Sequence, residues 1–514
     1  MKKSLLVVLA LLAIVSLGAQ DFIIANGAEP ATLDPSLMTD TTSANIDFAL
    51  NEGLTVYDPR TSLPIPAMAE SWTTSADGLT VTFKIRKDAL WSDGTPVTAD
   101  DFVYGWLRTL DPETASDYGW MIGMVVKGAG EYNSGKGKAE DVGLKALDAK
   151  TFQVTLSGPA AYFVGMTAHH AFAPLPKWVI EKHGNNWTKP GNYVGTGAYI
   201  LKEWKPQDYV LVEKNPKYWD AKNVKLKSIK YLASDNSTTN YKMFKAGAVD
   251  WQVGITLDLI DEIKLRKDYQ LSARFGTYYL SFNVTKSPFT DVNVRKAFAA
   301  AIDKVTLIDK VVKGGQIPTE AFTPAMAGYS PQKGVGFDPA AAKKYLAAAG
   351  YPDGKGFPPL TYIYNTNEGH KKIAEYVQQQ LKQNLNIEVK VENMEWNSFL
   401  SLRSKHDYVF ARHGWIGDYL DPNTMLDLFV TGSGNNDGAY SNPAFDRAIT
   451  AAVSATGDAR MKLLMEAEKI LLTQDQAFIP IYHYTNQDMI DTTKWGGWYP
   501  NPLGFHPPKF IYKK

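Results

Sequence analysis

Residues 77–112, DGLTVTFKIRKDALWSDGTPVTADDFVYGWLRTLDP, join the pattern of a β-strand to that of an α-helix. Residues 79–85 alternate apolar and polar side chains, which predicts a half-buried strand whose inner face carries Leu79, Val81, Phe83 and Ile85. Residues 98–110 begin with polar helix-start residues and then place apolar side chains at helical spacing: Phe102, Trp106 and Leu110. The stretch therefore predicts mixed strands and helices.

The same mixture continues along the chain. Helical spacing predicts one long helix over residues 291–313, which ends at Gly314 and Gly315. A helix pattern is then followed by a strand pattern twice, which is typical of an α/β sheet domain. The other predicted elements are strands at 152–156, 209–213, 387–391 and 478–482 and helices at 338–350, 373–381 and 458–472.

The length of 514 residues is too great for one core, and we expect roughly two to four domains. Hydrophobic residues make up 45% and charged residues 21%, which is an ordinary globular composition. There are 54 basic and 54 acidic residues, so no strong field of one sign covers the molecule. Nucleic acid is therefore not expected as a partner.

The first residues, MKKSLLVVLALLAIVSLGAQ, have a basic start, an apolar run and small residues near position 19. This pattern predicts a secretory signal peptide over residues 1–19. The rest of the chain has no apolar run of the roughly 20 residues that a spanning helix needs, and it has no cysteine for a lipid anchor or a disulfide. We expect an exported, soluble protein of the periplasm.

Motifs of common enzyme classes are missing from the sequence. The glycine cluster at 191–199 lacks the lysine of a phosphate-binding loop, and no GxSxG sequence is present. His169 and His170 are adjacent, and neither belongs to a metal-binding pair of the HExxH type. We therefore expect no catalytic residues, no metal and no cofactor, and a protein that is not an enzyme.

Several stretches in a fixed order resemble the oligopeptide-binding members of the periplasmic solute receptors that serve ATP-driven (ABC) importers, the extracellular solute-binding proteins of family 5. These stretches are GAEPATLDPSL at 27–37, AESW at 69–72, residues 77–112, GNYVGTGAYILKEW at 191–204, EKNPKYWDA at 213–221, SPFTDVNVRKAFAAAIDK at 287–304 and GWIGDYLDP at 414–422. Their order and spacing cover the chain almost from end to end.

The resemblance implies an α/β, two-lobed periplasmic-binding-protein fold that closes on its ligand like a hinged trap. It also implies an additional third domain over residues 52–173. Lobe I would be discontinuous, built from residues 20–51, 174–275 and 486–514, and lobe II would span residues 276–485.

Residues Gly417-Asp418-Tyr419 match a family motif. The resemblance implies that Asp418 pairs with the free α-amino group of a peptide. An ammonium group would supply the charge and the hydrogen bonds that a buried carboxylate lacks. From the residues alone, a structural turn next to Pro422 and Asn423 explains Asp418 equally well. For Asp421, which directly precedes Pro422, we expect a structural role in the turn.

Other matches imply contacts around the same ligand. Arg403, Arg412 and His370 fall where relatives meet the carboxylate of the peptide, a task that suits the planar fork of arginine. For Arg403, a helix end explains the residue equally well. Aromatic residues match the walls of side-chain pockets: Trp415, Trp396, Tyr484, Tyr279 and Tyr118.

Two departures from the family pattern concern the binding region. Gly276 and Ile416 stand where the enteric relatives carry a disulfide, so packing must replace that bond here. The relatives also carry a lysine that contacts a carboxylate of the ligand. In this sequence that lysine is replaced near Val312, and Lys313 is the next residue.

The segment LMTDTTSAN at 37–45, which contains Thr39, Asp40 and Thr41, matches the part of the family that pairs with a peptide as a strand. Backbone pairing would explain binding of peptides with little sequence preference. We expect a monomer that delivers peptides to membrane permease subunits. The alternatives are a receptor of the same fold for a dipeptide, nickel chelate, haem or oligosaccharide, or a secreted peptide hydrolase.

Overall fold

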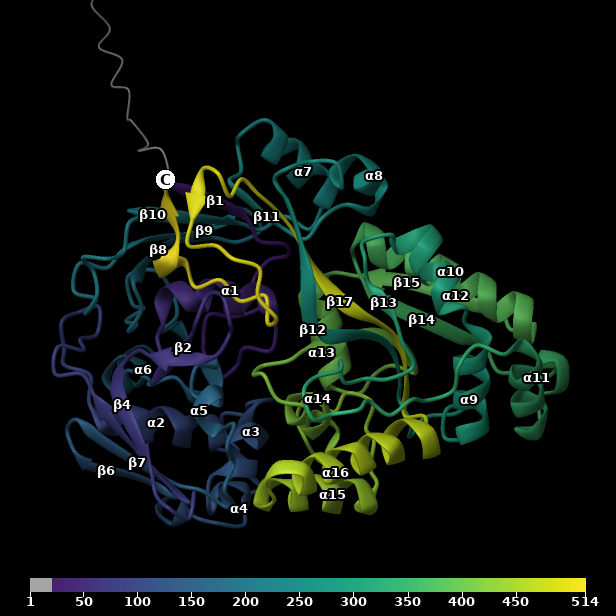
Figure 1. Ribbon diagram of the computed structural model, residues 1–514, viewed down its shortest axis with the longest axis horizontal. Helices are drawn as coiled ribbons and strands as arrows, with labels where there is room; N and C mark the ends of the chain where they lie inside the picture. The colour runs from purple at the N-terminus through teal and green to yellow at the C-terminus, as the bar shows by residue number, and fades with distance from the viewer. Residues whose placement is uncertain (1–20) are drawn as a thin grey trace, which may run out of the picture.

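A computed structural model describes residues 21–514, so the predicted signal peptide at 1–19 lies outside the described residues. Within residues 21–514, the largest sheet has eleven strands and extends through both lobes of the molecule (Figure 1). From one edge to the other, the order is β15 (Val389–Met394), β14 (Leu360–Asn365), β16 (Phe410–Ile416), β12 (Tyr269–Phe282), β17 (Phe478–Ile490), β11 (Trp251–Val253), β1 (Phe22–Ala25), β10 (Ser228–Leu232), β9 (Tyr209–Lys214) and β8 (Tyr199–Lys205), with β13 (Ile317–Pro318) against β17.

Two long antiparallel strands, β12 and β17, run from the lobe that contains β1 and β8–β11 into the lobe that contains β14 and β15 (Figure 1). Their register shifts between Ala273 and Thr277 and again between Tyr278 and Tyr279. Such irregularities bend a strand and increase its twist. The two lobes therefore share a continuous, bent pair of strands.

A separate four-stranded sheet builds the additional domain, at the lower left of Figure 1. Its order is β4 (Ala69–Thr74), β5 (Thr80–Ile85), β7 (Thr151–Thr155) and β6 (Leu144–Asp148). Thr98 is the N-cap of helix α2 (Ala99–Leu110), and its side chain and that of Asp101 form a reciprocal capping box. The predicted stripe of Phe102, Trp106 and Leu110 is fully buried, and each such side chain contributes about 1.5–3 kcal/mol. The strand and the helix predicted from residues 77–112 are confirmed.

Helices surround both lobes and the space between them (Figure 1). They are α1 (Thr41–Leu50), α3 (Gly119–Val125), α4 (Ala129–Asn133), α5 (Phe163–Met166), α6 (Lys177–His183), α7 (Ser237–Lys245), α8 (Ile260–Ile263), α9 (Val292–Ala301), α10 (Lys304–Thr306), α11 (Pro339–Ala348), α12 (Glu368–Leu385), α13 (Trp396–Ser404), α14 (Asn423–Leu426), α15 (Pro443–Ser454) and α16 (Gly457–Glu468). Two pairs of short strands lie outside these sheets: β2 (Thr55–Tyr57) with β3 (Pro64–Pro66), and β18 (Trp495–Gly496) with β19 (Tyr512–Lys513).

The prediction of one long helix over residues 291–313 is wrong, because the helix is interrupted near residue 302. Helix α9 ends at Ala301, and Ile302 leaves the helix with φ −107° and ψ 113°. Asp303 then starts α10, where its side chain accepts a hydrogen bond from the backbone of Thr306. An aspartate that caps a new helix competes with continuation of the old one, and the apolar spacing alone does not reveal this.

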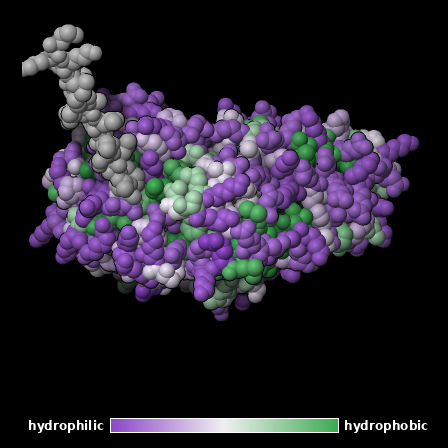
Figure 2. Space-filling model, turned by 90° about the horizontal axis from the view of Figure 1, so that it is seen from above, coloured by the Kyte–Doolittle hydropathy of each residue, from purple (hydrophilic) through white to green (hydrophobic). Residues whose placement is uncertain are grey.

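The face seen in Figure 2 is largely hydrophilic, with hydrophobic residues in small, separated groups. In the described part of the chain, none of the helices combines the length and the apolar character that crossing a membrane requires.

Candidate functional site

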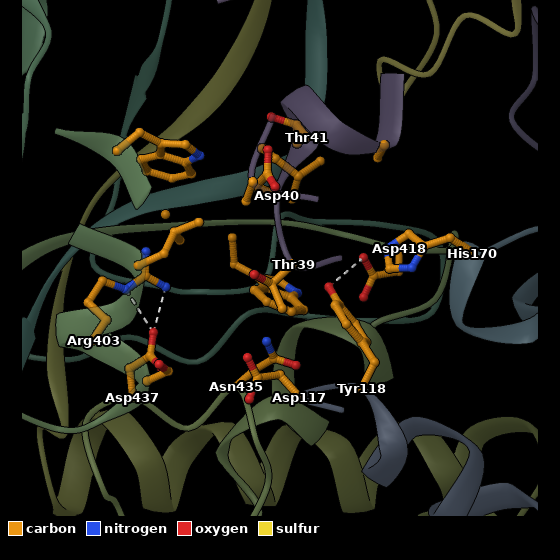
Figure 3. Close-up of a pocket in the computed structure, with 18 of the residues that line it drawn as sticks. Thr39, Asp40, Thr41, Asp117, Tyr118, His170, Arg403, Asp418, Asn435 and Asp437 are labelled. Atoms are coloured by element: carbon orange, nitrogen blue, oxygen red, sulfur yellow. Dashed lines mark hydrogen bonds and ion pairs between the residues drawn. The ribbon is translucent and has the colours of Figure 1, made fainter. Parts of the chain in front are cut away.

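A cavity of about 540 Å³ lies between the lobes and the additional domain. Its wall combines the start of α1, the region before α3, helix α13, the end of β16 and Tyr484 of β17. Figure 3 shows Asp40 and Thr41 at the top of this space and Thr39 below them, with Asp418 and Tyr118 on the right and Arg403 and Asp437 on the left. Elements far apart in the sequence therefore contribute charged and aromatic groups to one enclosed volume.

Most of the predicted site residues line this cavity. They are Asp418, Arg412, Arg403, Trp415, Trp396, Tyr484, Tyr118, Thr39, Asp40 and Thr41. His370 lines a second cavity of about 250 Å³, and Tyr279 lines neither of the two. The second cavity shares Thr41, Arg274 and Tyr484 with the first, so the two spaces adjoin.

Asp418 is 5% exposed and presents an incompletely bonded carboxylate to the cavity. Tyr118 donates a hydrogen bond from its hydroxyl to Oδ1 at 3.3 Å, and His169 Nε2 lies 3.4 Å from the same oxygen. Oδ2 is shielded from solvent and has no hydrogen-bond partner among residues 21–514. A buried carboxylate oxygen without a donor is costly, so this atom marks a place for a cationic or donating group from outside the chain.

The loop that carries Asp418 is held by several polar contacts. The backbone N–H of Asp418 donates to Thr424 Oγ1 at 3.0 Å, and Tyr57 donates to the Asp418 carbonyl at 2.7 Å. Three residues on, Asp421 accepts two hydrogen bonds from Arg460, at 2.8 and 2.6 Å. The turn interpretation thus describes Asp421, whereas the side chain of Asp418 takes no part in the turn.

Arg412 lies on β16 and points toward Tyr484. Its Nη2 donates to the Tyr484 hydroxyl at 3.2 Å, and its guanidinium lies 5.1 Å from the ring centre of Tyr278. Nε is buried without an acceptor, and no ion pair is found for this guanidinium in the described structure. Aromatic rings compensate a cation only partly, so Arg412 retains the capacity to bind an anion.

Arg403 differs from Arg412 because it already has a counter-ion. Its Nε and Nη2 donate to Asp437 Oδ2 at 2.8 and 2.5 Å. Burial would raise the pKa of Asp437, but Arg403 and a hydrogen bond from His413 lower it to about 2. Arg403 lies in the last turn of α13, as the helix-end interpretation expects, and its charge is compensated by Asp437. A contact between Arg403 and a ligand carboxylate stays a prediction.

His413 completes this group as a neutral imidazole. Burial and the neighbouring Arg403 lower the pKa of His413 to about 4. Its Nδ1 lies 2.8 Å from the Gly414 backbone nitrogen, and its Nε2 lies 2.8 Å from Asp437 Oδ2 and 2.5 Å from Arg403 Nη2.

The segment predicted to pair as a strand, residues 37–45, is only partly extended. Asp40 has extended backbone angles, but α1 begins at Thr41 and includes the second half of the segment. The Asp40 carboxylate caps this helix by accepting from the backbone and the hydroxyl of Ser43, at 2.9 and 2.7 Å. The prediction of strand pairing with a ligand therefore applies only to the residues up to Asp40.

His370 and Tyr279 lie outside the 540 Å³ cavity. Burial and the charge of Arg412 lower the pKa of His370 well below its ordinary value, so its predicted contact with a carboxylate would come from a neutral imidazole N–H. Tyr279 is 2% exposed and stacks on His413 with ring centres 4.5 Å apart. Successive residues of β12 face opposite sides, so Tyr279 belongs to the core behind the cavity wall.

Gly276 and Ile416 are direct partners in the pairing of β12 with β16. A Cβ atom at Gly276 would lie 2.7 Å from Ile416 Cδ1 and 2.5 Å from the Trp415 carbonyl oxygen. The side chain of Ile416 thus occupies the space beside Gly276. Packing joins the two strands at the position where the family resemblance implies a disulfide in relatives.

Several ionisable residues of the cavity were missed by the sequence interpretation. Arg274, Asp117, Asp437 and His169 all line it. Burial and the charge of Asp437 raise the pKa of Asp117 to about 6. These residues lie in no motif of their own, and only the fold brings them to one place. No group of three or more potential metal ligands occurs within the described residues.

Comparison with known proteins identifies the family. Residues 64–437 match the family described as "Bacterial extracellular solute-binding proteins, family 5 Middle". The chain belongs to this family. A crystal structure of a periplasmic oligopeptide-binding protein from Borrelia burgdorferi is 38% identical, with a TM-score of 0.93 over 96% of this chain and 99% of the other. Haemophilus influenzae OppA in complex with RPPGFSPFR is 34% identical, with a TM-score of 0.91 over 96% and 99%.

Two structures of a third relative indicate which arrangement of the lobes the present chain resembles. The murein tripeptide binding protein MppA of Escherichia coli is 34% identical, with a TM-score of 0.92 over 96% of this chain and 98% of the other. The unliganded open form of MppA gives a TM-score of only 0.64 over the same shares of the two chains, at 33% identity. The lobes of the present family 5 chain are therefore not arranged as in that open form.

Proposed function

We propose that the protein is the substrate-binding receptor of an ABC importer and that it captures oligopeptides with little sequence preference. The unpartnered Oδ2 of Asp418 carries this proposal. It provides a buried anionic group in a cavity that also contains the uncompensated cation of Arg412. A free peptide is a zwitterion with an ammonium at one end and a carboxylate at the other, and it matches both groups.

The backbone of β16 supports binding that does not depend on side chains. Strand β14 pairs with β16 only as far as Ala411. Residues Gly414 to Ile416 line the cavity and have no strand on that side within residues 21–514. An extended peptide can pair with this edge, because backbone N–H and C=O groups are the same in every peptide.

The two charged groups limit the length of peptide between them. Arg412 lies within β16 and Asp418 lies just beyond its end. At a rise of about 3.3 Å per residue, their Cα atoms are at most about 20 Å apart. A fully extended peptide that spans both groups would have roughly six residues or fewer.

Closure of the lobes around the peptide would bury it and form the surface that membrane permease subunits recognise. The greater likeness to the first MppA structure than to its open form supports this view. For the moving parts we propose lobe I as residues 20–51, 174–275 and 486–514, lobe II as 276–485, and the additional domain as 52–173. The lobe boundaries then fall within β12 and β17.

The receptor would act in the periplasm as a monomer, without catalysis and without a cofactor. The test is incubation of purified protein with defined free peptides of two to six residues, followed by calorimetry and mass spectrometry of the peptides. Intact peptides that bind when free and bind much more weakly when N-acetylated would support the proposal. Cleaved peptides, or equal affinity for the acetylated form, would contradict it.

Replacing Gly414 with Ala is expected to weaken binding of free peptides by roughly three- to tenfold. A Cβ atom there would lie 2.2 Å from the Tyr484 hydroxyl and 3.3 Å from Arg412 Nη2. The tyrosine must move, and it would then leave the guanidinium in a less defined position. Gly165→Ala is the matched control, because the nearest atom to its Cβ is at 3.9 Å. Equal peptide affinities for the two variants in calorimetry would show that this contact has no role.

A further inference from the structure

Arg274 is a second arginine that has no counter-ion within residues 21–514, and it lies where the two cavities meet. It belongs to β12, at the shift of register between Ala273 and Thr277. Arg274 and Tyr484 line both the 540 Å³ cavity and the 250 Å³ cavity. Tyr484 also accepts the hydrogen bond of Arg412, so two guanidinium groups flank one tyrosine.

The guanidinium of Arg274 has no acceptor in the described structure. Its Nε is shielded from solvent and unbonded, and neither a hydrogen bond nor an ion pair is found for its side chain among residues 21–514. By contrast, Arg403 and Arg460, which are also largely buried, pair with Asp437 and Asp421. A donor that is shielded from solvent normally has an acceptor, so Nε of Arg274 marks a place for an acceptor from outside the chain.

Charges of the protein offset the burial of Arg274 only in part. Burial lowers the pKa of Arg274, and Asp488 and Tyr484 raise it again. Asp488 lines the second cavity, but its Oδ1 accepts from Trp251 Nε1 at 3.1 Å and it forms no ion pair with Arg274 in the described chain. Burial also raises the pKa of Asp488 to about 6, and Arg274 and a hydrogen bond from Trp251 act against this rise.

The neighbouring backbone leaves room for this guanidinium. Gly504 has φ 69°, and a Cβ there would lie 3.0 Å from Arg274 Nε and 3.2 Å from its Cζ. A side chain at this position would press on the guanidinium, whereas glycine permits the close approach and the positive φ together.

A peptide bound as proposed above leaves one of the two cations uncompensated. Its single terminal carboxylate supplies one negative charge, which Arg412 takes. We propose that Arg274 binds a second carboxylate, so that the receptor favours peptides whose last residue is Asp or Glu. Such a residue carries its side-chain carboxylate beside the terminal one, and the 250 Å³ cavity provides space next to Arg274.

This inference rests on the proposed function. A carboxylate at Arg274 could also come from the end of a longer peptide and not from an acidic side chain. The terminal carboxylate of a peptide one or two residues longer could pass Arg412 and reach Arg274. The experiment must therefore vary the terminal residue and the length separately.

The test compares peptides that end in Glu with otherwise identical peptides that end in Gln, in calorimetric titrations at fixed salt. For the unaltered protein we expect the Glu peptide to bind at least about tenfold more tightly, as for one charge-assisted hydrogen-bonded contact. Arg274→Gln should reduce this ratio below about threefold and leave the affinity for the Gln peptide within about threefold. Arg447→Gln, which removes the same charge from an exposed position on α15, should behave as the unaltered protein.

A length series of peptides without acidic side chains forms the second arm. A preference for longer peptides that Arg274→Gln abolishes would identify the terminal carboxylate as the group bound. Equal affinity of the unaltered protein for Glu and Gln peptides, together with no length preference, overturns the inference even if Arg274→Gln does not fold. A Glu preference that survives Arg274→Gln also overturns it. Failure to bind any peptide would instead contradict the proposed function.

Discussion

Replacing Asp418 with Asn is expected to weaken binding of a free peptide by a factor of about 100 or more. Loss of one partner of a buried ion pair costs on the order of 3 kcal/mol, because the remaining charge stays desolvated without compensation. The amide of Asn would also direct N–H groups toward the ligand ammonium. Tyr118 and His169 at Oδ1 cannot replace the lost charge, since both are potential donors.

Calorimetry with one peptide in free and N-acetylated forms measures this effect. The unaltered protein should distinguish the two forms strongly, and Asp418→Asn should bind both weakly and about equally. Asp235→Asn, at an exposed position, removes the same charge away from the cavity and should change nothing. If Asp418→Asn retains the preference for the free amino group, Asp418 does not bind it.

Replacing Asp421 with Ala is expected to lower the free energy of unfolding by about 3–5 kcal/mol. The two hydrogen bonds from Arg460 form a bidentate ion pair, and the side chains are only 13% and 8% exposed. Removal of the carboxylate leaves a buried guanidinium without a counter-ion. Peptide affinity should fall as well, because Asp421 belongs to the loop that carries Asp418.

Urea unfolding at neutral pH measures the change in free energy. Glu181→Ala is the matched control, because its partner Lys177 and Glu181 are 58% and 63% exposed and such surface pairs contribute at most about 1 kcal/mol. Asp421→Ala combined with Arg460→Met should recover part of the loss, since no buried charge remains. Equal destabilisation by Asp421→Ala and Glu181→Ala would contradict the importance of the pair.

The local pattern of the sequence was sufficient for most strands and helices, because alternation and helical spacing record which faces are buried. It was insufficient at Asp303, where a capping side chain ends one helix and starts another. It was also insufficient for Tyr279, because an aromatic residue on a strand fits a cavity wall and a core equally well, and the partner His413 becomes its neighbour only after folding.

The charged residues of the site show more clearly what the sequence pattern does not reveal. The family resemblance was enough to propose Asp418 as a ligand-binding residue, but it did not predict that Oδ2 of Asp418 has no hydrogen-bond partner among the described residues. The same carboxylate contact is predicted for Arg403 and Arg412, yet Arg403 pairs with Asp437 and Arg412 contacts the two tyrosines Tyr484 and Tyr278. Arg274 has no neighbour in sequence that would suggest a site. Whether an arginine is compensated depends on residues that are distant along the chain, so only the tertiary structure distinguishes them.

The close contact of Ile416 with Gly276 determines how the cavity wall responds to its chemical surroundings. A covalent sulfur link at this position would open under thiol reductants and form again under oxidation. Van der Waals contact between an isoleucine and a glycine has no such dependence. The edge of β16 that we propose for peptide pairing should therefore keep its shape under reducing and oxidising conditions alike.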